Sequence, residues 1–405
     1  MLKSCAVEDP DDSPLAVARN RSRAGLFLMT NSFETGGSER QFVLLAQNLD
    51  ADQFQLHTGC IWRYGPFAEG FGEVPEFPLG GSLYGWKSLR ARLELSRHLR
   101  RNGVQIAHAF DFYSNLTMIP AARLARVPVV IGSHRQLGDL LTPAQFRAQA
   151  VAFRWCDAVI CNSLAGANRL AAAGLGRGKL FVVGNAMPAS AFLAATPALP
   201  RRPGVLRVGM VARMNARYKN HSGFLRIAAR VREQLPSVEF LLAGDGPLRP
   251  EIEQEAGALG LENSVTFLGD RRDMSSVLAS MDVAVLTSDS EGLSNVILEA
   301  MAARLPVVAY DVGGNAELVN QERGALVAAG DEAGFAAAIL RIVSDSAAAS
   351  SLGRQMGGNA RRFVEENFSL EHVRSRYLDL YRSLLEGKSQ RMNRPKVDAP
   401  KASTA

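Results

Sequence analysis

The sequence predicts an α/β protein with two parallel sheets, each flanked by helices. Two observations support this prediction. Short apolar runs alternate with helical stretches from Gly25 onward, and the alternation stops once, in an Ala/Pro-rich segment at 189–203, before it restarts. Alternation of strand and helix is typical of parallel sheets. A chain of 405 residues is long enough for two such domains, each with its own core.

The predicted elements follow from these apolar runs and from helical composition. In the first half, the predicted strands are 26–30, 56–62, 105–109, 127–132, 158–162 and 180–184, and the predicted helices are 39–49, 88–101 and 115–124. Segment 189–203 reads as a linker. In the second half, the predicted strands are 206–211, 239–243, 265–268, 283–286 and 307–310, and the predicted helices are 224–234, 248–259, 274–280 and one that begins at Ser294. We expect a cleft between the halves, with strand-end loops on both sides.

The composition is that of an ordinary globular protein, with 47% hydrophobic and 21% charged residues. Residues 1–23 lack a long apolar stretch and do not resemble a signal peptide. The apolar run 127–131 is too short to span a membrane. The four cysteines have neither metal-site nor disulfide spacing. We therefore expect a cytoplasmic protein.

A basic stripe with interleaved apolar residues lies at 83–101. It consists of Lys87, Arg90, Arg92, Arg97, Arg100 and Arg101, with Leu83, Trp86, Leu89, Leu93 and Leu99 between them. Such a stripe is usually the solvated face of an amphipathic helix, and it also suits peripheral contact with an anionic membrane surface. The modest net charge of +6 and the lack of a nucleic-acid-binding motif argue against a nucleic-acid partner.

The most informative segment contains Glu291 and Glu299, which are separated by a turn and a helix start. Glu291 follows predicted strand 283–286, and ligands of open α/β sheets bind at the carboxyl ends of strands. Glu299 lies about 12 Å further along at about 1.5 Å per residue, which approximates the reach from a hexose across a pyrophosphate to a ribose. Each carboxylate can accept hydrogen bonds from sugar hydroxyls. On spacing alone, an equally good interpretation is that Glu291 caps the helix and Glu299 is solvated.

Other strand-end loops supply groups that suit a diphosphate. The helix that carries Glu299 begins with backbone N–H groups around Ser294. Gly36 and Gly37 precede a predicted helix and allow close backbone approach, although such a pair is also a common turn. Arg213 and Lys219 follow predicted strand 206–211, and two cations there can neutralise a developing phosphate charge. The three-glycine dinucleotide fingerprint is absent from the first loop, which weakens an oxidoreductase interpretation.

Two histidines end strands of the first half. We expect His134 and His108 to face the cleft, where a neutral imidazole can bind a sugar hydroxyl. A lone histidine is more often structural, and this alternative is stronger for His108.

With these residues in place, the chain resembles the retaining glycosyltransferases of family 4, whose fold is GT-B: two Rossmann-like domains with the active site between them. The resemblance extends from about Leu26 to Leu385. It is most specific in 288–308 and 313–317, which contain the family's pattern of a glutamate, seven residues and a second glutamate, with its usual flanks.

The resemblance implies a role for each site residue. Glu291 would bind the donor hexose, Glu299 the ribose, and Arg213 with Lys219 the pyrophosphate, while His134 would contact the sugar. Backbone contacts to the donor would come from Gly36, Gly37, Gly292, Leu293, Ser294 and Asn295. Contacts to the acceptor would come from His108 and Arg135.

The resemblance also implies domain boundaries. Residues 1–22 would be a disordered extension, 23–195 the acceptor domain and 204–365 the donor domain. Residues 366–386 would form a helix that crosses back to the first domain, with Tyr377 and Tyr381 packed against it. From their composition, rich in Lys, Pro, Ser and Ala, we expect residues 387–405 to be a disordered tail.

The implied reaction transfers a sugar from a nucleoside diphosphate sugar to an acceptor hydroxyl with retention of configuration. The acceptor would be a saccharide or lipid-linked saccharide, in polysaccharide, lipopolysaccharide or glycolipid synthesis. No metal or other cofactor is expected, because Arg213, Lys219 and the helix N-terminus can neutralise the diphosphate. One alternative is a nucleotide-sugar epimerase of related fold, although no clear acid/base set is visible. Another is a donor-binding scaffold without turnover.

Overall fold

Two six-stranded parallel sheets form the centres of two domains in the computed structural model, which describes residues 23–344 and 352–392. The strand order is β2-β1-β3-β4-β5-β6 in the first domain and β12-β11-β10-β7-β8-β9 in the second. The strands are β1 (Ala24–Thr30), β2 (Phe54–Cys60), β3 (Val104–Ala109), β4 (Val129–His134), β5 (Ala158–Cys161), β6 (Leu180–Val182), β7 (Leu206–Val211), β8 (Val238–Ala243), β9 (Val265–Gly269), β10 (Val283–Leu286), β11 (Val307–Tyr310) and β12 (Gly324–Val327). The predicted α/β class with two parallel sheets is confirmed.

Helices cover both faces of each sheet. In the first domain they are α1 (Gly37–Gln47), α2 (Trp86–Arg101), α3 (Phe112–Ala125), α4 (Pro143–Arg154) and α5 (Leu164–Ala172). In the second domain they are α6 (His221–Gln234), α7 (Arg249–Ala258), α8 (Met274–Ala279), α9 (Asn295–Ala302), α10 (Asn315–Leu318) and α11 (Glu332–Ser344). Because the central strands β4 and β10 are buried along their whole length, their sequences are continuous apolar runs with few polar residues.

The sequence analysis did not name α4, α5, α10, α11 or β12. Three of these are short, since α5 spans nine residues and α10 and β12 span four each, and runs of that length give a weak periodic signal. The strands and helices that were predicted all lie within a few residues of their observed positions. Within the described residues, no helix is long and apolar enough to cross a membrane.

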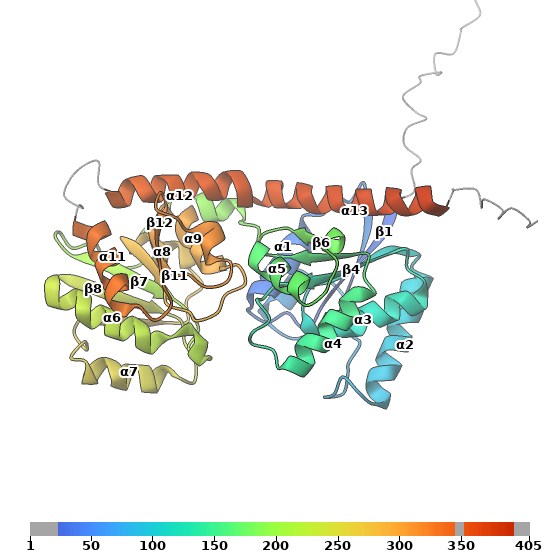
Figure 1. The fold of residues 1–405 in the computed structure, drawn as a ribbon, viewed down its shortest axis with the longest axis horizontal. Coiled ribbons are helices and arrows are strands. Elements are labelled where there is room, and N and C mark those ends of the chain that lie inside the picture. The colour runs from blue at the N-terminus through green and yellow to red at the C-terminus, as the bar shows by residue number, and fades with distance from the viewer. Residues whose placement is uncertain (1–22, 345–351, 393–405) are drawn as a thin grey trace, which may run out of the picture.

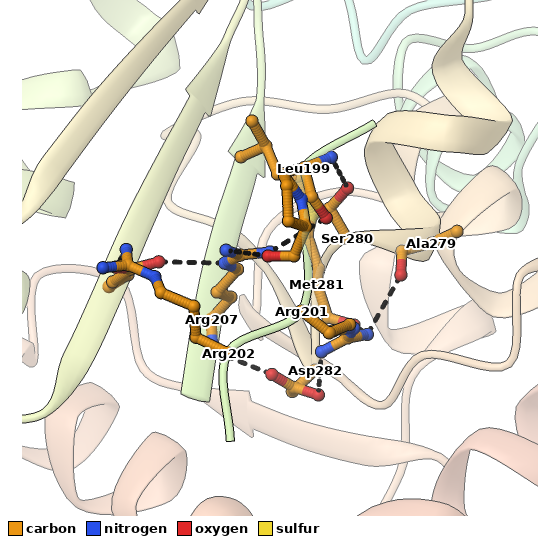
Figure 2. Close-up of polar contacts among 10 residues, drawn as sticks. Leu199, Arg201, Arg202, Arg207, Ala279, Ser280, Met281 and Asp282 are labelled. Carbon is orange, nitrogen blue, oxygen red and sulfur yellow. Dashed lines mark hydrogen bonds and ion pairs between the residues drawn. The ribbon is translucent and has the colours of Figure 1, made fainter. Parts of the chain in front are cut away.

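The expected linker at 189–203 is fixed to the second domain. Figure 2 shows two arginines that fix it: Arg201, near the end of the segment, reaches Asp282, and Arg207, on β7, reaches back to the segment. Arg207, whose side chain is only 4% exposed, donates to the carbonyls of Leu199 and Pro200 and to Glu239 Oε2. Arg201 donates to Asp282 Oδ1 at 2.7 Å. The linker's end is therefore held at the amino ends of β7, β8 and β10, opposite the strand ends that carry the candidate site residues.

The C-terminal helices cross from the second domain to the first (Figure 1). Helix α12 (Leu352–Phe368) lies along the second domain, and α13 (Leu370–Met392) continues along the first. At the break between them, the Met187 N–H donates to Phe368 O at 2.7 Å and the Leu370 N–H donates to Met187 O at 2.9 Å. Tyr377 and Tyr381 are buried in the first domain's core. Helix α13 therefore lies on the first domain, to which we expected residues 366–386 to cross.

Two boundaries of this region differ from expectation. The crossing segment begins at Leu370, after the break, and not at 366. We expected a disordered tail from 387, whereas α13 continues to Met392, because the helical pattern persists beyond the residues that pack on the first domain. The expected disorder at 1–22 and 393–405 lies outside the described residues.

His108 joins the first sheet to α13. Its ring is fully buried, with Nδ1 2.7 Å from the Tyr381 hydroxyl and Nε2 2.7 Å from Ser133 Oγ. Burial lowers the pKa of His108 to about 3, so the ring is neutral at pH 7. The structure does not support the expected contact of His108 with an acceptor, because both ring nitrogens are already engaged in the core.

Replacing Tyr381 with Phe should destabilise the protein by about 1–3 kcal/mol, because it leaves His108 Nδ1 buried without a partner. Urea unfolding of Tyr381→Phe measures this difference. The matched control is Tyr113→Phe, at a half-exposed tyrosine of the same domain, which should change stability by less than about 0.5 kcal/mol. Equal stability of the two variants would contradict the structural role of His108.

Candidate active site

Strand-end loops of the two domains touch one another. A Cβ atom added to Gly292, in the loop between β10 and α9, would lie 2.8 Å from Arg135 O at the end of β4. One added to Gly37 would lie 2.8 Å from Asn295 Nδ2. The Glu317 carboxylate, from α10, accepts hydrogen bonds from the Leu164 and Ala165 N–H groups at the start of α5. The loops that line the expected cleft therefore contact one another across the domain boundary.

Glycine is required in the loop after β11. Gly313 has a φ of 55°, and a Cβ there would overlap the carbonyl of Glu291. A Cβ on Gly314 would similarly overlap the carbonyl of Gly292. This loop thus supports the backbone of the segment that presents Glu291.

Lys219 and Glu291 form an ion pair. Lys219 Nζ donates to Glu291 Oε1 at 2.7 Å, and the two side chains are 21% and 12% exposed. Lys219 is held in place by Asn220, whose left-handed backbone begins α6 and whose carbonyl accepts from Thr287 Oγ1 at 2.9 Å. The predicted proximity of Lys219 to Glu291 is thus observed. Arg213 lies exposed in the same loop.

Glu299 is paired with a residue that the sequence analysis missed. Arg40, on the first turn of α1, donates to Glu299 Oε1 from the opposite domain. The Glu299 side chain is 14% exposed, and burial raises the pKa of its carboxyl while Arg40 lowers it. Glu299 is therefore not the solvated helix residue of the alternative interpretation.

The start of α9 is held by a chain of hydrogen bonds. Ser294 caps the helix, with its hydroxyl accepting from the Ile297 N–H. Asn185 Nδ2 donates to Leu293 O at 3.0 Å and to Asn295 Oδ1 at 2.8 Å. Arg135 in turn donates to Asn185 Oδ1 at 2.6 Å.

Arg135 has a different environment from the one expected. Its guanidinium group donates to Asn185 and to the Tyr377 hydroxyl, and it lies over the Phe110 ring at 5.6 Å. The guanidinium N–H groups of Arg135 are therefore engaged by side chains of the protein itself. We therefore assign Arg135 to the connection between α13, Asn185 and α9, in place of the expected acceptor contact.

His134 is buried beneath the cleft surface. Its ring is 1% exposed and packs edge-on against Phe146 and Phe153, with ring centroids 6.3 and 6.2 Å away. Burial lowers its pKa to about 4, so the ring is neutral at pH 7. We expected the ring to face the cleft, whereas these aromatic contacts all come from the first domain.

Glu39 is a second residue that the sequence analysis missed. Its carboxylate lies over Gly36, the N-cap of α1, and Asp111, at the end of β3, is close enough to affect its ionisation. Desolvation raises the pKa of Glu39 to about 7, and Asp111 adds to the rise while Arg213 opposes it. The only sequence signal was its place directly after Gly36, Gly37 and Ser38.

A cavity of about 980 Å³ borders the ion pair between Arg40 and Glu299. Its walls come from α1, the linker, the loop that precedes α8, and α8 and α9. A volume of this size is within the usual range for small-molecule sites. The lining residues that we use below are Arg40, Arg272, Met274 and Glu299.

Known proteins share this sequence and fold. Residues 205–345 match the family described as glycosyl transferases group 1, and residues 35–190 match that described as glycosyltransferase family 4. The lipopolysaccharide core biosynthesis glycosyltransferase LpsE of Rhizobium meliloti is 32% identical over 249 residues, which cover 61% of this chain and 69% of the relative. The chain belongs to the family 4 glycosyltransferases. The glycosyltransferase activity expected from the resemblance is thus supported at the level of the family.

Further similarities to this glycosyltransferase cover most of its length. The putative glycosyltransferase EpsF of Bacillus subtilis is 28% identical over 313 residues, which cover 72% of this chain and 80% of EpsF. The structure of Anabaena Alr3699/HepE in complex with UDP has a TM-score of 0.76 at 21% identity and covers 89% of this chain and 100% of HepE. A glycosyltransferase from Rickettsia africae has the same TM-score at 17% identity, covering 90% of this chain and all of that one. The predicted GT-B fold is confirmed.

The raised pKa of Glu39 predicts a pH-dependent stability. Between pH 4.5 and 7 the folded protein holds more of this proton than the unfolded chain, so the free energy of unfolding falls as pH rises through that window. Glu39→Gln removes the effect. The variant's stability relative to the wild type should therefore be about 1–2 kcal/mol greater at pH 8 than at pH 5, after allowing for partial exposure.

Urea unfolding at both pH values measures this difference. Glu73→Gln, at an exposed glutamate of the same domain, is the control and should show no such trend. A Glu39→Gln variant that tracks the wild type at both pH values would show that the carboxyl is not desolvated.

Proposed function

We propose that this glycosyltransferase transfers a sugar from a nucleoside diphosphate sugar to an acceptor hydroxyl, with retention of anomeric configuration. The proposed acceptor is a saccharide or lipid-linked saccharide, in cell-surface polysaccharide, lipopolysaccharide or glycolipid synthesis. The observation that carries the proposal is the Lys219–Glu291 ion pair beside the start of α9, with Glu299 one to two turns further along the same helix.

Each end of this arrangement suits one part of the donor. Glu291 accepts hydrogen bonds from the hexose, and Lys219 with Arg213 neutralises the diphosphate. The backbone N–H groups at the start of α9 add to this, because a helix N-terminus attracts anions. Glu299 binds the ribose at the edge of the cavity, and the nucleobase lies further in, near Arg272 and Met274.

The proposed mechanism is a front-face displacement. The bond between the anomeric carbon and the diphosphate oxygen breaks, and the acceptor oxygen bonds to the same face of that carbon. The departing phosphate takes the acceptor's proton. Lys219, Arg213 and the α9 N-terminus stabilise the negative charge that develops on the phosphate, and we therefore propose that no metal is required.

We propose revised roles for His134 and for the pair Gly36 and Gly37. His134 acts through packing beneath the cleft floor, because its ring is buried. Gly36 and Gly37 approach the phosphate through their backbone, and the Glu39 carboxylate must move away from Gly36 or be protonated for that approach.

The relatives support the donor and acceptor classes. HepE has been crystallised with UDP, with UDP and glucose, and with UDP-glucose. LpsE is described as acting in lipopolysaccharide core biosynthesis. We extend a nucleotide hexose donor and a saccharide acceptor to this protein on that basis.

Lys219→Met and Glu291→Gln should each lower turnover at least about 100-fold, because each removes a charge next to the developing phosphate or the sugar. The assay is release of nucleoside diphosphate from a panel of nucleotide sugars, with cell-envelope extract as acceptor source. The control is Arg217→Met, two residues before Lys219, whose guanidinium pairs with Glu251 in exposed positions.

Arg217→Met should keep near-normal turnover, and circular dichroism should show all three variants folded. Near-normal rates in folded Lys219→Met or Glu291→Gln would remove that residue from the mechanism. Donor binding without any release by the wild type would favour the scaffold alternative. The anomeric configuration of the product, read by NMR, tests retention separately.

A further inference from the structure

The start of α2 presents large apolar side chains to solvent. Tyr84 is 79% exposed, Trp86 76% and Leu89 46%, and Tyr113 at the start of α3 is 44% exposed. Single exposed apolar residues are common, but aromatic side chains gathered this openly mark an interaction surface. We call these four residues the α2 patch.

Helices α2 and α3 run parallel and side by side (Figure 1). Arg92, on α2, donates to Leu116 O on α3, and Arg100 donates to Leu124 O, so the two helices keep a constant offset. The same offset places Leu89 level with Tyr113. The exposed residues of the patch therefore lie at the starts of two neighbouring helices.

Basic side chains surround the α2 patch. The exposed charged residues of α2 are Lys87, Arg90, Glu94, Arg97, Arg100 and Arg101, of which only Glu94 is acidic. Glu94 is paired with Arg90 at 2.8 Å. Two residues of the basic stripe predicted from the sequence do not belong to this exposed surface. Arg92 donates to the Leu83 and Leu116 carbonyls, and Leu99 is buried in the core.

The patch and the first domain's wall of the cleft lie at the same edge of the first sheet. Helices α2 and α3 follow the parallel strands β2 and β3, so both begin at the carboxyl edge of the first sheet. The same edge carries Gly36, Gly37 and the end of β4, which form the first domain's wall of the cleft. A surface bound to the patch therefore lies at the same edge of the first sheet as this wall.

We propose that the α2 patch binds an anionic lipid surface and so presents the cleft to an acceptor held in that surface. Trp and Tyr prefer the membrane interface, where the ring is partly buried and its polar end stays hydrated. The surrounding cations match the negative potential of an anionic leaflet. The part of this proposal that concerns a lipid-held acceptor rests on the proposed function, whereas the part that concerns lipid binding is independent of it.

Charge and shape favour a lipid surface over a soluble saccharide. The basic residues extend along four turns of α2, which suits a helix lying in the plane of a charged surface. The cavity beside Arg40 and Glu299 is lined from α1, the linker, α8 and α9, among others, and includes no residue of the patch.

Vesicle flotation of the full chain, without donor, tests the proposal. Vesicles of phosphatidylcholine with 30% phosphatidylglycerol should bind the wild type, and vesicles of phosphatidylcholine alone should bind it at least about fivefold less. Binding to the anionic vesicles should weaken as salt rises, because the cations are screened. The Trp emission of the bound protein should shift to shorter wavelength.

Two variants and a control locate the surface. Trp86→Ser with Leu89→Ser, and Lys87→Glu with Arg97→Glu, should each lower binding to anionic vesicles at least about fivefold. Trp155→Ser, at a half-exposed tryptophan beside α4 in the same domain, should bind like the wild type. Release of nucleoside diphosphate from soluble donor should be unchanged in all three, so loss of lipid binding is distinguished from loss of transferase activity.

The proposal is overturned if the wild type does not bind anionic vesicles, or if the Trp86/Leu89 variant binds as well as the wild type. Binding of a soluble oligosaccharide to the patch, with no vesicle binding, would also overturn it and would identify a carbohydrate platform.

Discussion

The ion pair between Arg40 and Glu299 is the interaction on which the site depends most. Glu299 is a largely buried carboxylate of the second domain, and its hydrogen-bond partner in the described part of the chain is an arginine of the first. Leaving such a carboxylate unpaired is strongly destabilising. The second domain's part of the site is therefore completed by α1, and the two walls are brought together by this pairing and by the contacts of Gly37 and Gly292.

The C-terminal helix is connected to the same site. Tyr377 on α13 accepts from Arg135, Arg135 donates to Asn185, and Asn185 donates to the start of α9. The break at Ser369 binds Met187, just beyond β6. The long crossing segment thus does more than cover the first sheet, because it holds the residues that orient the helix carrying Glu299.

Much of this arrangement was predictable because its signals are local. Alternating apolar runs identified both sheets, and the strand-end positions of Glu291 and Lys219 indicated a shared site. The partner of Glu299 was not predictable, since Arg40 lies 259 residues away and its position resembles an ordinary helix start. Burial was the second obstacle. His108 and His134 both end strands, and the sequence does not reveal that α13 and Phe146 cover them.

The most direct test of a site shared by both domains is a double-mutant cycle on donor affinity. Calorimetry would give the dissociation constant of the nucleotide sugar that most stabilises the wild type, for the wild type, Arg40→Met, Glu299→Gln and the double variant. We predict that each single change weakens binding at least about tenfold, and that the double variant is little worse than the weaker single. Unchanged affinity in Arg40→Met, or strictly multiplicative losses, would contradict a donor site completed by the first domain.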